Sequence, residues 1–236
     1  MHKIIDLIPV LDAAEVARVH ADVHAARPRW TRRDPVHPFF TLGAASYLDD
    51  LDEYHERRAA LNPVLQGSFA WLYDKVIEFL ERRLHAPVTL ADNLALPGFH
   101  IWLAPAVFVT PDASVHFDLQ YLRTWPKDAP DVDFSRPLSF TLPIRLPRRG
   151  GGLNVWDLTY ERYRRFAVRV NAPLQPMDVT VLLDRMRHPY TPGAIVVHSG
   201  HLMHQIGEVE AVDADDERVT LQGHALCQRG EWKLYW

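Results

Sequence analysis

The chain has 236 residues, of which 47% are apolar and 24% are charged, so it is not a largely disordered protein and can bury a sizeable core. The net charge of −4 excludes a general electrostatic attraction to nucleic acid or to anionic membranes. The single cysteine, Cys227, excludes an internal disulfide and a thiolate-rich metal site, and we expect it to be a small core residue.

No segment reads as a membrane anchor or a signal peptide. The longest apolar stretch, residues 101–109, is much shorter than the roughly 20 residues that span a bilayer. Asp6 and Asp12 interrupt the apolar residues near the N-terminus. We therefore expect one cytoplasmic domain over residues 1–236, with no membrane or nucleic-acid partner and with the oligomeric state left open.

The first 96 residues predict helices. Asp12 can cap a helix that runs to about residue 26, in which valines recur at helical spacing. Residues 27–38 are rich in proline and arginine and predict a loop. A second helix is expected from Pro63 to residue 84, because its apolar residues recur at i, i+3, i+4 and i+7 and Pro87 follows.

The remainder of the chain, residues 97–236, predicts short strands separated by turn residues. Strands are expected at residues 100–109, 114–121, 138–146, 153–157, 166–170, 179–183, 194–198, 204–212 and 218–227. This spacing favours an antiparallel sandwich or barrel, with the N-terminal helices packed on one outer face.

The first candidate for chemistry is His116-Phe117-Asp118. Residues two apart on a strand point to the same face, so the imidazole and the carboxylate can reach one metal ion. With 13 His and 20 Asp in the chain, about one such H-x-D triplet is expected by chance. A second copy, His20-Ala21-Asp22, lies in the predicted first helix, where i and i+2 diverge and a solvated helix face is expected.

The second candidate is the segment that starts at Pro192-Gly193 and continues as an apolar strand, a tight loop and a new strand. It carries His198, His201 and His204, each able to supply a third ligand. Arg218 and Thr220 follow, again two apart on a predicted strand.

This order of motifs resembles the iron(II)/2-oxoglutarate-dependent oxygenase superfamily over residues 97–227. The resemblance implies a double-stranded β-helix (jelly-roll, cupin-like) fold that carries the site. It implies that His116, Asp118 and His204 bind Fe(II) and that Arg218 and Thr220 bind the far carboxylate of 2-oxoglutarate, which reacts with O2. No catalytic residue is implied beyond the metal centre. A 2-His-1-carboxylate set leaves coordination positions open, and a guanidinium pairs with a carboxylate through two hydrogen bonds.

The activity that the resemblance implies is hydroxylation of an unactivated C–H bond, with release of succinate and CO2. We expect a small, amino acid-like substrate, free or bound to a peptide or carrier. Asp118 favours oxygen insertion over halogenation, because halogenating relatives have a small residue in its place. Gln222 stands where some relatives have another arginine, so a second guanidinium contact is not expected.

One geometric condition must hold. A simple hairpin across residues 213–216 would place Arg218 roughly 20 Å from His204 along the strand. The function therefore requires residues 213–217 to carry the chain from one sheet to the facing sheet.

Alternatives remain open at this level. His116 and Asp118 can be a buried hydrogen-bonded pair, His201 can replace His204 as the ligand, and His198 can close the loop or point into the pocket. Arg218 can be an exposed partner of Asp215 or Asp216. A cupin-like metalloenzyme that does not use 2-oxoglutarate, and a binding module without catalysis, are the competing functions.

Other side chains are expected to be structural. Arg145 and Asn154 suit solvated strand faces and turn flanks more than substrate contacts. The arginines at 162, 164, 165 and 169 suit a solvated surface more than an anionic ligand or carrier. The core or the pocket wall is expected to include Trp102, Phe117, Tyr121 and Trp156.

Overall fold

The computed structural model describes residues 5–104, 113–126, 128–171 and 173–236. The strands of its larger sheet are β1 (Ile5–Pro9), β2 (Thr31–Arg32), β3 (Phe39–Leu42), β4 (Val88–Leu90), β5 (Gly98–Leu103), β6 (Val132–Arg145), β9 (Ala194–Ser199), β11 (Glu217–Gln228) and β12 (Glu231–Tyr235). The strands of its smaller sheet are β7 (Leu153–Thr159), β8 (Arg185–His188) and β10 (Leu202–Ile206).

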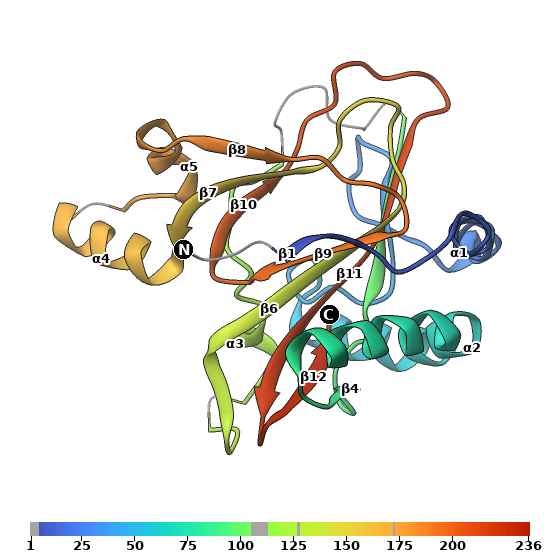
Figure 1. Cartoon of the computed structure of the whole chain (residues 1–236), viewed down its shortest axis with the longest axis horizontal. Coiled ribbons are helices and arrows are strands. Elements are labelled where there is room, and N and C mark those ends of the chain that lie inside the picture. Colours follow the sequence, from blue (N-terminus) through green and yellow to red (C-terminus); the bar gives the residue numbers. More distant parts are fainter. Residues whose placement is uncertain (1–4, 105–112, 127, 172) are drawn as a thin grey trace.

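The larger sheet has nine strands within the described residues, and the smaller has three (Figure 1). The larger sheet follows the order β1-β9-β6-β11-β5-β3-β2, with β12 and β4 joined beside β11. The smaller sheet follows the order β10-β7-β8. Except for the parallel pair β12 and β4, the neighbouring strands are antiparallel.

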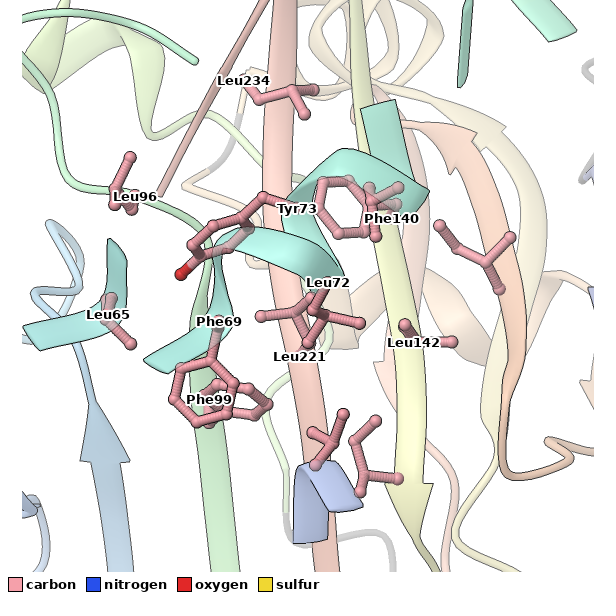
Figure 2. Packing of buried hydrophobic residues seen from close by; sticks show 14 of the residues in the cluster. Leu65, Phe69, Leu72, Tyr73, Leu96, Phe99, Phe140, Leu142, Leu221 and Leu234 are labelled. Atoms are coloured by element: carbon pink, nitrogen blue, oxygen red, sulfur yellow. The ribbon is translucent and has the colours of Figure 1, made fainter. Parts of the chain in front are cut away.

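Apolar side chains on one face of the larger sheet pack against α1 (Ala13–Ala25) and α2 (Leu51–Leu84). Figure 2 shows this cluster, to which α2 and three strands contribute Phe69, Leu72, Tyr73, Phe99, Phe140, Leu142 and Leu221. Burial of each large side chain contributes about 1.5–3 kcal/mol. The predicted arrangement, a mainly β core with N-terminal helices on one face, is confirmed, and the opposite face of the sheet is left for the site.

The first helix begins where it was predicted, and the second does not. Asp12 accepts a hydrogen bond from the backbone N–H of Glu15 (2.8 Å), and Glu15 accepts one from that of Asp12 (3.0 Å). The start of α2 lies at Leu51, capped by Asp50, and Pro63 lies inside the helix. The turns before Pro63 are mostly exposed, so they lack the apolar stripe on which the prediction rested.

Two predicted strands are helical instead. Residues 166–170 belong to α4 (Tyr160–Val170), and residues 179–183 overlap α5 (Pro176–Val179) and the 3₁₀ turn η2 (Thr180–Leu182). Their valines and leucines favour strands when read alone. The N-cap Thr159 and the packing of Tyr160 and Tyr163 near Trp156 start α4 upstream of residues 166–170, and Val179 and Leu183 pack into the same cluster.

Three other predicted strands differ in extent. Residues 114–121 form a single β-bridge, at His116, before the short helix α3 (Tyr121–Thr124). The strand expected at 204–212 is β10, which ends at Ile206. Residues 105–109 of the strand expected at 100–109 lie outside the described residues. The loop expected at 27–38 contains the 3₁₀ turn η1 (Arg27–Arg29) and β2.

The segment at residues 213–216 joins the two sheets. It leaves the smaller sheet after β10 and enters the larger sheet at β11, so the geometric condition for the predicted site is met. Arg148 holds the segment through ion pairs with Asp213 (2.9 Å) and Asp215 (3.2 Å). None of the helices in the described ranges has the length and apolar character needed to cross a bilayer.

Gly98 should be intolerant of a side chain. A Cβ at this position would lie 2.2 Å from the Trp236 ring and 2.8 Å from the Leu42 carbonyl oxygen. We expect Gly98→Ala to lower the free energy of unfolding, measured with urea, by about 2–3 kcal/mol. Gly67→Ala is the matched control, because nothing lies within 4 Å of its Cβ position in α2 and alanine favours helix. Equal effects of the two substitutions would contradict this packing.

Candidate metal centre and cosubstrate pocket

The inner face of the larger sheet is polar and lines a cavity of about 910 Å³. On β11, Arg218, Gln222 and His224 line this cavity, whereas Val219 and Leu221 point into the apolar core. The smaller sheet contributes Leu153, His204 and Ile206 to the opposite wall. Further lining residues are Asp34, His37, Tyr47, His100, His116, Asp118, Gln120, Arg123, Ser139, Thr141, Tyr190 and His198.

The backbone brings His116, Asp118 and His204 together. His116 and His204 exchange two backbone hydrogen bonds (2.9 and 3.0 Å), which places the two residues directly opposite each other. The backbone N–H of Asp118 donates to the carbonyl of Gly200 in the turn between β9 and β10 (2.7 Å). The H-x-D segment is therefore anchored to the strand and turn that carry His204.

Hydrogen bonds determine which ring nitrogen of each histidine can bind a metal. The Nδ1 of His116 lies 2.8 Å from the carbonyl oxygen of Ser114, and the Nδ1 of His204 lies 2.8 Å from that of Leu202. Because a carbonyl only accepts, each neutral ring carries its proton on Nδ1. The lone pair of each Nε2 is then available for a metal ion.

Distances within the trio suit one metal ion. The Nε2 atoms of His116 and His204 lie 3.7 and 3.4 Å from oxygens of Asp118, and the ligand atoms of the trio lie within 4.8 Å of one another. Two ligands at about 2.1 Å and 90° on an octahedral ion are about 3 Å apart. A bound ion therefore requires only small side-chain adjustments.

The protonation states also suit a metal. Burial lowers the pKa of His204 to about 3, so its imidazole is neutral at pH 7. Burial raises the pKa of Asp118, but the imidazoles of His204, His224, His116 and His198 more than offset it and hold the pKa well below its usual range. The carboxylate also accepts a hydrogen bond from Gln120 (3.1 Å). The trio thus offers a neutral His204 ring and an ionised carboxylate.

Arg218 is a buried cation in the same cavity, with an exposed fraction of 1%. Its Nε donates to the carbonyl of Gly151 (3.1 Å) and its Nη1 to the hydroxyl of Thr220 (3.4 Å). Burial lowers its pKa, which Tyr190 partly opposes. Among the described residues, no carboxylate lies within 4.0 Å of its nitrogens. The alternative of an exposed ion pair with Asp215 or Asp216 is wrong.

The other two histidines of the C-terminal block are not part of the trio. His198 is buried, and its ring centroid lies 4.6 Å from that of His204. The Nε2 of His201 lies 2.8 Å from the hydroxyl of Tyr121. Of the three, the structure therefore places only His204 within the group of potential ligands.

Two predictions about solvated residues are wrong. Asn154 is 1% exposed and donates to Glu208 (2.9 Å), so it belongs to a buried polar network rather than a turn flank. His20 does not lie on a fully solvated helix face, because its Nε2 contacts Glu217 at 2.5 Å. The arginines of α4 and Arg145 are exposed, as expected.

The aromatic residues and Cys227 lie close to where they were expected. Phe117, Tyr121 and Trp156 are buried. The ring of Trp102 stacks on that of Phe39, with the two ring centroids 3.8 Å apart. Cys227 is half-buried against the main apolar cluster.

Sequence reasoning missed His100 and His224, which line the cavity from β5 and β11. The Nε2 of His100 contacts the hydroxyl of Tyr47, and the Nδ1 of His224 lies 3.1 Å from that of Ser139. The signal for His224 was alternation, because it continues the polar series Arg218, Thr220 and Gln222 along one predicted strand. The residues after His100 do not alternate, so no such signal marked His100.

No family model matches the chain, and no curated protein is similar to it in sequence. Solved structures resemble it in fold. The carbocyclase SnoK from nogalamycin biosynthesis, described as non-haem and α-ketoglutarate-dependent, matches with a TM-score of 0.54 at 12% identity, covering 100% of this chain and 92% of that one. An N-substituted L-amino acid dioxygenase from Burkholderia ambifaria matches with a TM-score of 0.52 at 16% identity, covering 78% of this chain and 69% of that one.

A third structure, the α-ketoglutarate-dependent epimerase SnoN from the same biosynthesis, has a TM-score of 0.50 at 16% identity and covers 96% of this chain and 78% of that one. The chain thus has the jelly-roll fold of non-haem, α-ketoglutarate-dependent oxygenases, as the order of its motifs predicted.

Proposed function

We propose that the protein is an Fe(II)- and 2-oxoglutarate-dependent dioxygenase that hydroxylates a C–H bond of a small, amino acid-like molecule. The single observation that carries this proposal is the buried Arg218 guanidinium, which has no carboxylate partner among the described residues and shares one cavity with His116, Asp118 and His204. A buried charge is costly unless it is paired, so this cavity favours an anionic ligand.

The residues fit the metal that the fold family implies. His116, Asp118 and His204 would hold ferrous iron, because two imidazoles and one carboxylate form the donor set of non-haem iron oxygenases. When bound, iron and 2-oxoglutarate together activate dioxygen, and the cosubstrate leaves as succinate and CO2. The chain holds the ligands ready through the His116–His204 backbone pair and the two Nδ1 hydrogen bonds.

Arg218 and Thr220 would bind the far carboxylate of 2-oxoglutarate. The Nε contact with Gly151 and the Nη1 contact with Thr220 fix the plane of the guanidinium, so little rotamer freedom is lost when a carboxylate binds. Because both side chains are almost fully buried, water competes weakly for the same hydrogen bonds.

The walls of the cavity support an amino acid-like substrate. The cavity of about 910 Å³ is at the upper end of ligand pockets and is larger than 2-oxoglutarate alone requires. Its lining includes Asp34 and Arg123, which have opposite charges, and the aromatic rings of Phe39, Tyr47 and Trp102. A carboxylate and a guanidinium can bind the ammonium and carboxylate groups of one zwitterion.

Succinate release tests this function. Metal-free protein supplied with Fe(II), 2-oxoglutarate and O2 should release succinate, and one compound in a panel of amino acids and derivatives should stimulate the release. Folded protein that consumes no 2-oxoglutarate under any of these conditions would reject the proposal and favour a metalloenzyme that does not use this cosubstrate.

Replacement of Arg218 should act mainly on 2-oxoglutarate binding. We expect Arg218→Met, which keeps the volume and removes the charge, to raise the KM for 2-oxoglutarate by about 100-fold, because charge-assisted hydrogen bonds are lost. Arg145→Met is the matched control on β6, because its side chain is 56% exposed and outside the cavity. A well-folded Arg218→Met variant with unchanged KM would contradict this role. Circular dichroism and steady-state kinetics provide both readouts.

A further inference from the structure

A second group of potential metal ligands lies outside the cavity. His20 and His24 of α1 approach Glu217, the first residue of β11, through one carboxylate. The Nε2 of His20 lies 2.5 Å from one oxygen of Glu217, and the Nε2 of His24 lies 2.9 Å from the other. These three ligand atoms lie within 4.8 Å of one another.

The backbone explains why this group is separate from the cavity. His20 and His24 are four residues apart on α1, so both rings project from one face of the helix. Glu217 directly precedes Arg218 on β11, so the two side chains point to opposite faces of the sheet. Arg218 points into the cavity, and Glu217 points toward the side that α1 covers.

Burial and charge also suit a cation. The side chains of His20 and His24 are 33% and 35% exposed and that of Glu217 is 12% exposed, so the group is partly shielded but open on one side. His24 lies in the last turn of α1, where the helix dipole favours positive charge, and Trp30 packs edge-on against its ring. The positive charge of Arg145 disfavours a cation at this site, but its Nε lies 4.0 Å from Glu217 and its side chain is mostly in solvent.

We propose that His20, His24 and Glu217 form a second site for a divalent transition metal of the Zn²⁺ class. Ligands at about 2.0–2.2 Å in a tetrahedral site are about 3.3 Å apart, so the present contacts need to open by less than about 1 Å. The ion replaces the Nε2 protons that His20 and His24 share with Glu217, each neutral ring then carries its proton on Nδ1, and water completes the fourth position on the open side. It then links α1 to β11 and stabilises the fold. This inference does not rest on the proposed oxygenase function.

Zn²⁺ titration of the metal-free full-length chain tests the second site. Calorimetry should give two equivalents of Zn²⁺ for the wild type and one for His20→Gln/His24→Gln. The glutamine amides can still donate to Glu217, so this variant loses metal ligation but keeps a contact between α1 and β11. In His116→Gln/His204→Gln, which lacks the first trio, one equivalent should remain and should raise the Tm by about 5 °C at saturating Zn²⁺.

His55→Gln is the matched control, because His55 is exposed on α2 outside both groups. It should bind as many equivalents as the wild type. If His20→Gln/His24→Gln binds Zn²⁺ with the same stoichiometry and affinity as the wild type, the contact with Glu217 is only a hydrogen-bonded link and the proposal is wrong. If Zn²⁺ fails to bind at His116, Asp118 and His204 but binds at His20, His24 and Glu217, the result contradicts the oxygenase proposal and supports the second site.

Discussion

Asp118→Asn is expected to abolish iron retention and 2-oxoglutarate turnover, with a loss of at least about 100-fold in each. Asparagine keeps the shape of the side chain but removes its negative charge. Histidine binds a metal as the neutral imidazole, so with His116 and His204 as the remaining ligands the variant holds a divalent cation without a compensating charge. Iron per chain after anaerobic desalting and succinate release measure the two effects separately.

The control for Asp118→Asn is Asp157→Asn. Asp157 is an exposed carboxylate on β7, outside the cavity, and its replacement should change neither readout. The urea-unfolding curve of metal-free Asp118→Asn shows whether the variant folds. A folded variant that retains iron and turns over 2-oxoglutarate at the wild-type rate would show that another group holds the metal.

Acidification should destabilise the metal-free protein strongly. Burial lowers the pKa of four cavity histidines, His100, His198, His204 and His224, below the ordinary value of 6.5. As the pH falls below about 6.5, these imidazoles take up protons in the unfolded chain but resist them in the folded one. The unfolded state then binds more protons, so the free energy of unfolding falls as the pH falls.

Each such histidine contributes up to about 1.4 kcal/mol per pH unit to this slope, which makes the combined effect comparable to the whole stability of many domains. The check is the free energy of unfolding in urea between pH 7.5 and pH 5.5, with a chelator present. Low protein concentration is needed, because the pI near 6.3 lies in this range.

Single variants assign the slope to particular residues. His224→Gln should reduce it by up to about 1.4 kcal/mol per pH unit, because one buried imidazole is removed. His55→Gln, on the exposed face of α2, should leave it unchanged. A stability that stays constant from pH 7.5 to pH 5.5 would show that the cavity histidines accept protons in the folded state.

Short sequence patterns predicted the structure correctly where interactions between residues close in the chain determine it. The cap at Asp12 was predicted because a short acidic side chain before an apolar helical pattern satisfies the free N–H groups of the first turn. Residues 166–170 misled because a short run rich in valine fits a strand or a helix equally well, and the helix that starts upstream, at the Thr159 cap and with Tyr160 and Tyr163 packed near Trp156, continues through them. Pro63 led to a wrong start for the second helix, because the sequence does not distinguish a proline in the first turn of a helix from one that the helix tolerates in its interior.

By itself, the sequence determined the class of fold and the order of the motifs, since spacing along the chain carries that information. The resemblance of these motifs to a known superfamily named His116, Asp118, His204, Arg218 and Thr220 as candidates, with His201 left open as an alternative to His204. The tertiary structure was needed to show that His204 and not His201 lies in the group of potential ligands, and that Arg218 is buried and not paired with Asp215. It was also needed to show that His24 of α1 contacts Glu217, which lies 193 residues further along the chain. These outcomes depend on which strands and helices become neighbours, because alternation along a strand assigns a side chain to a face and not to a partner.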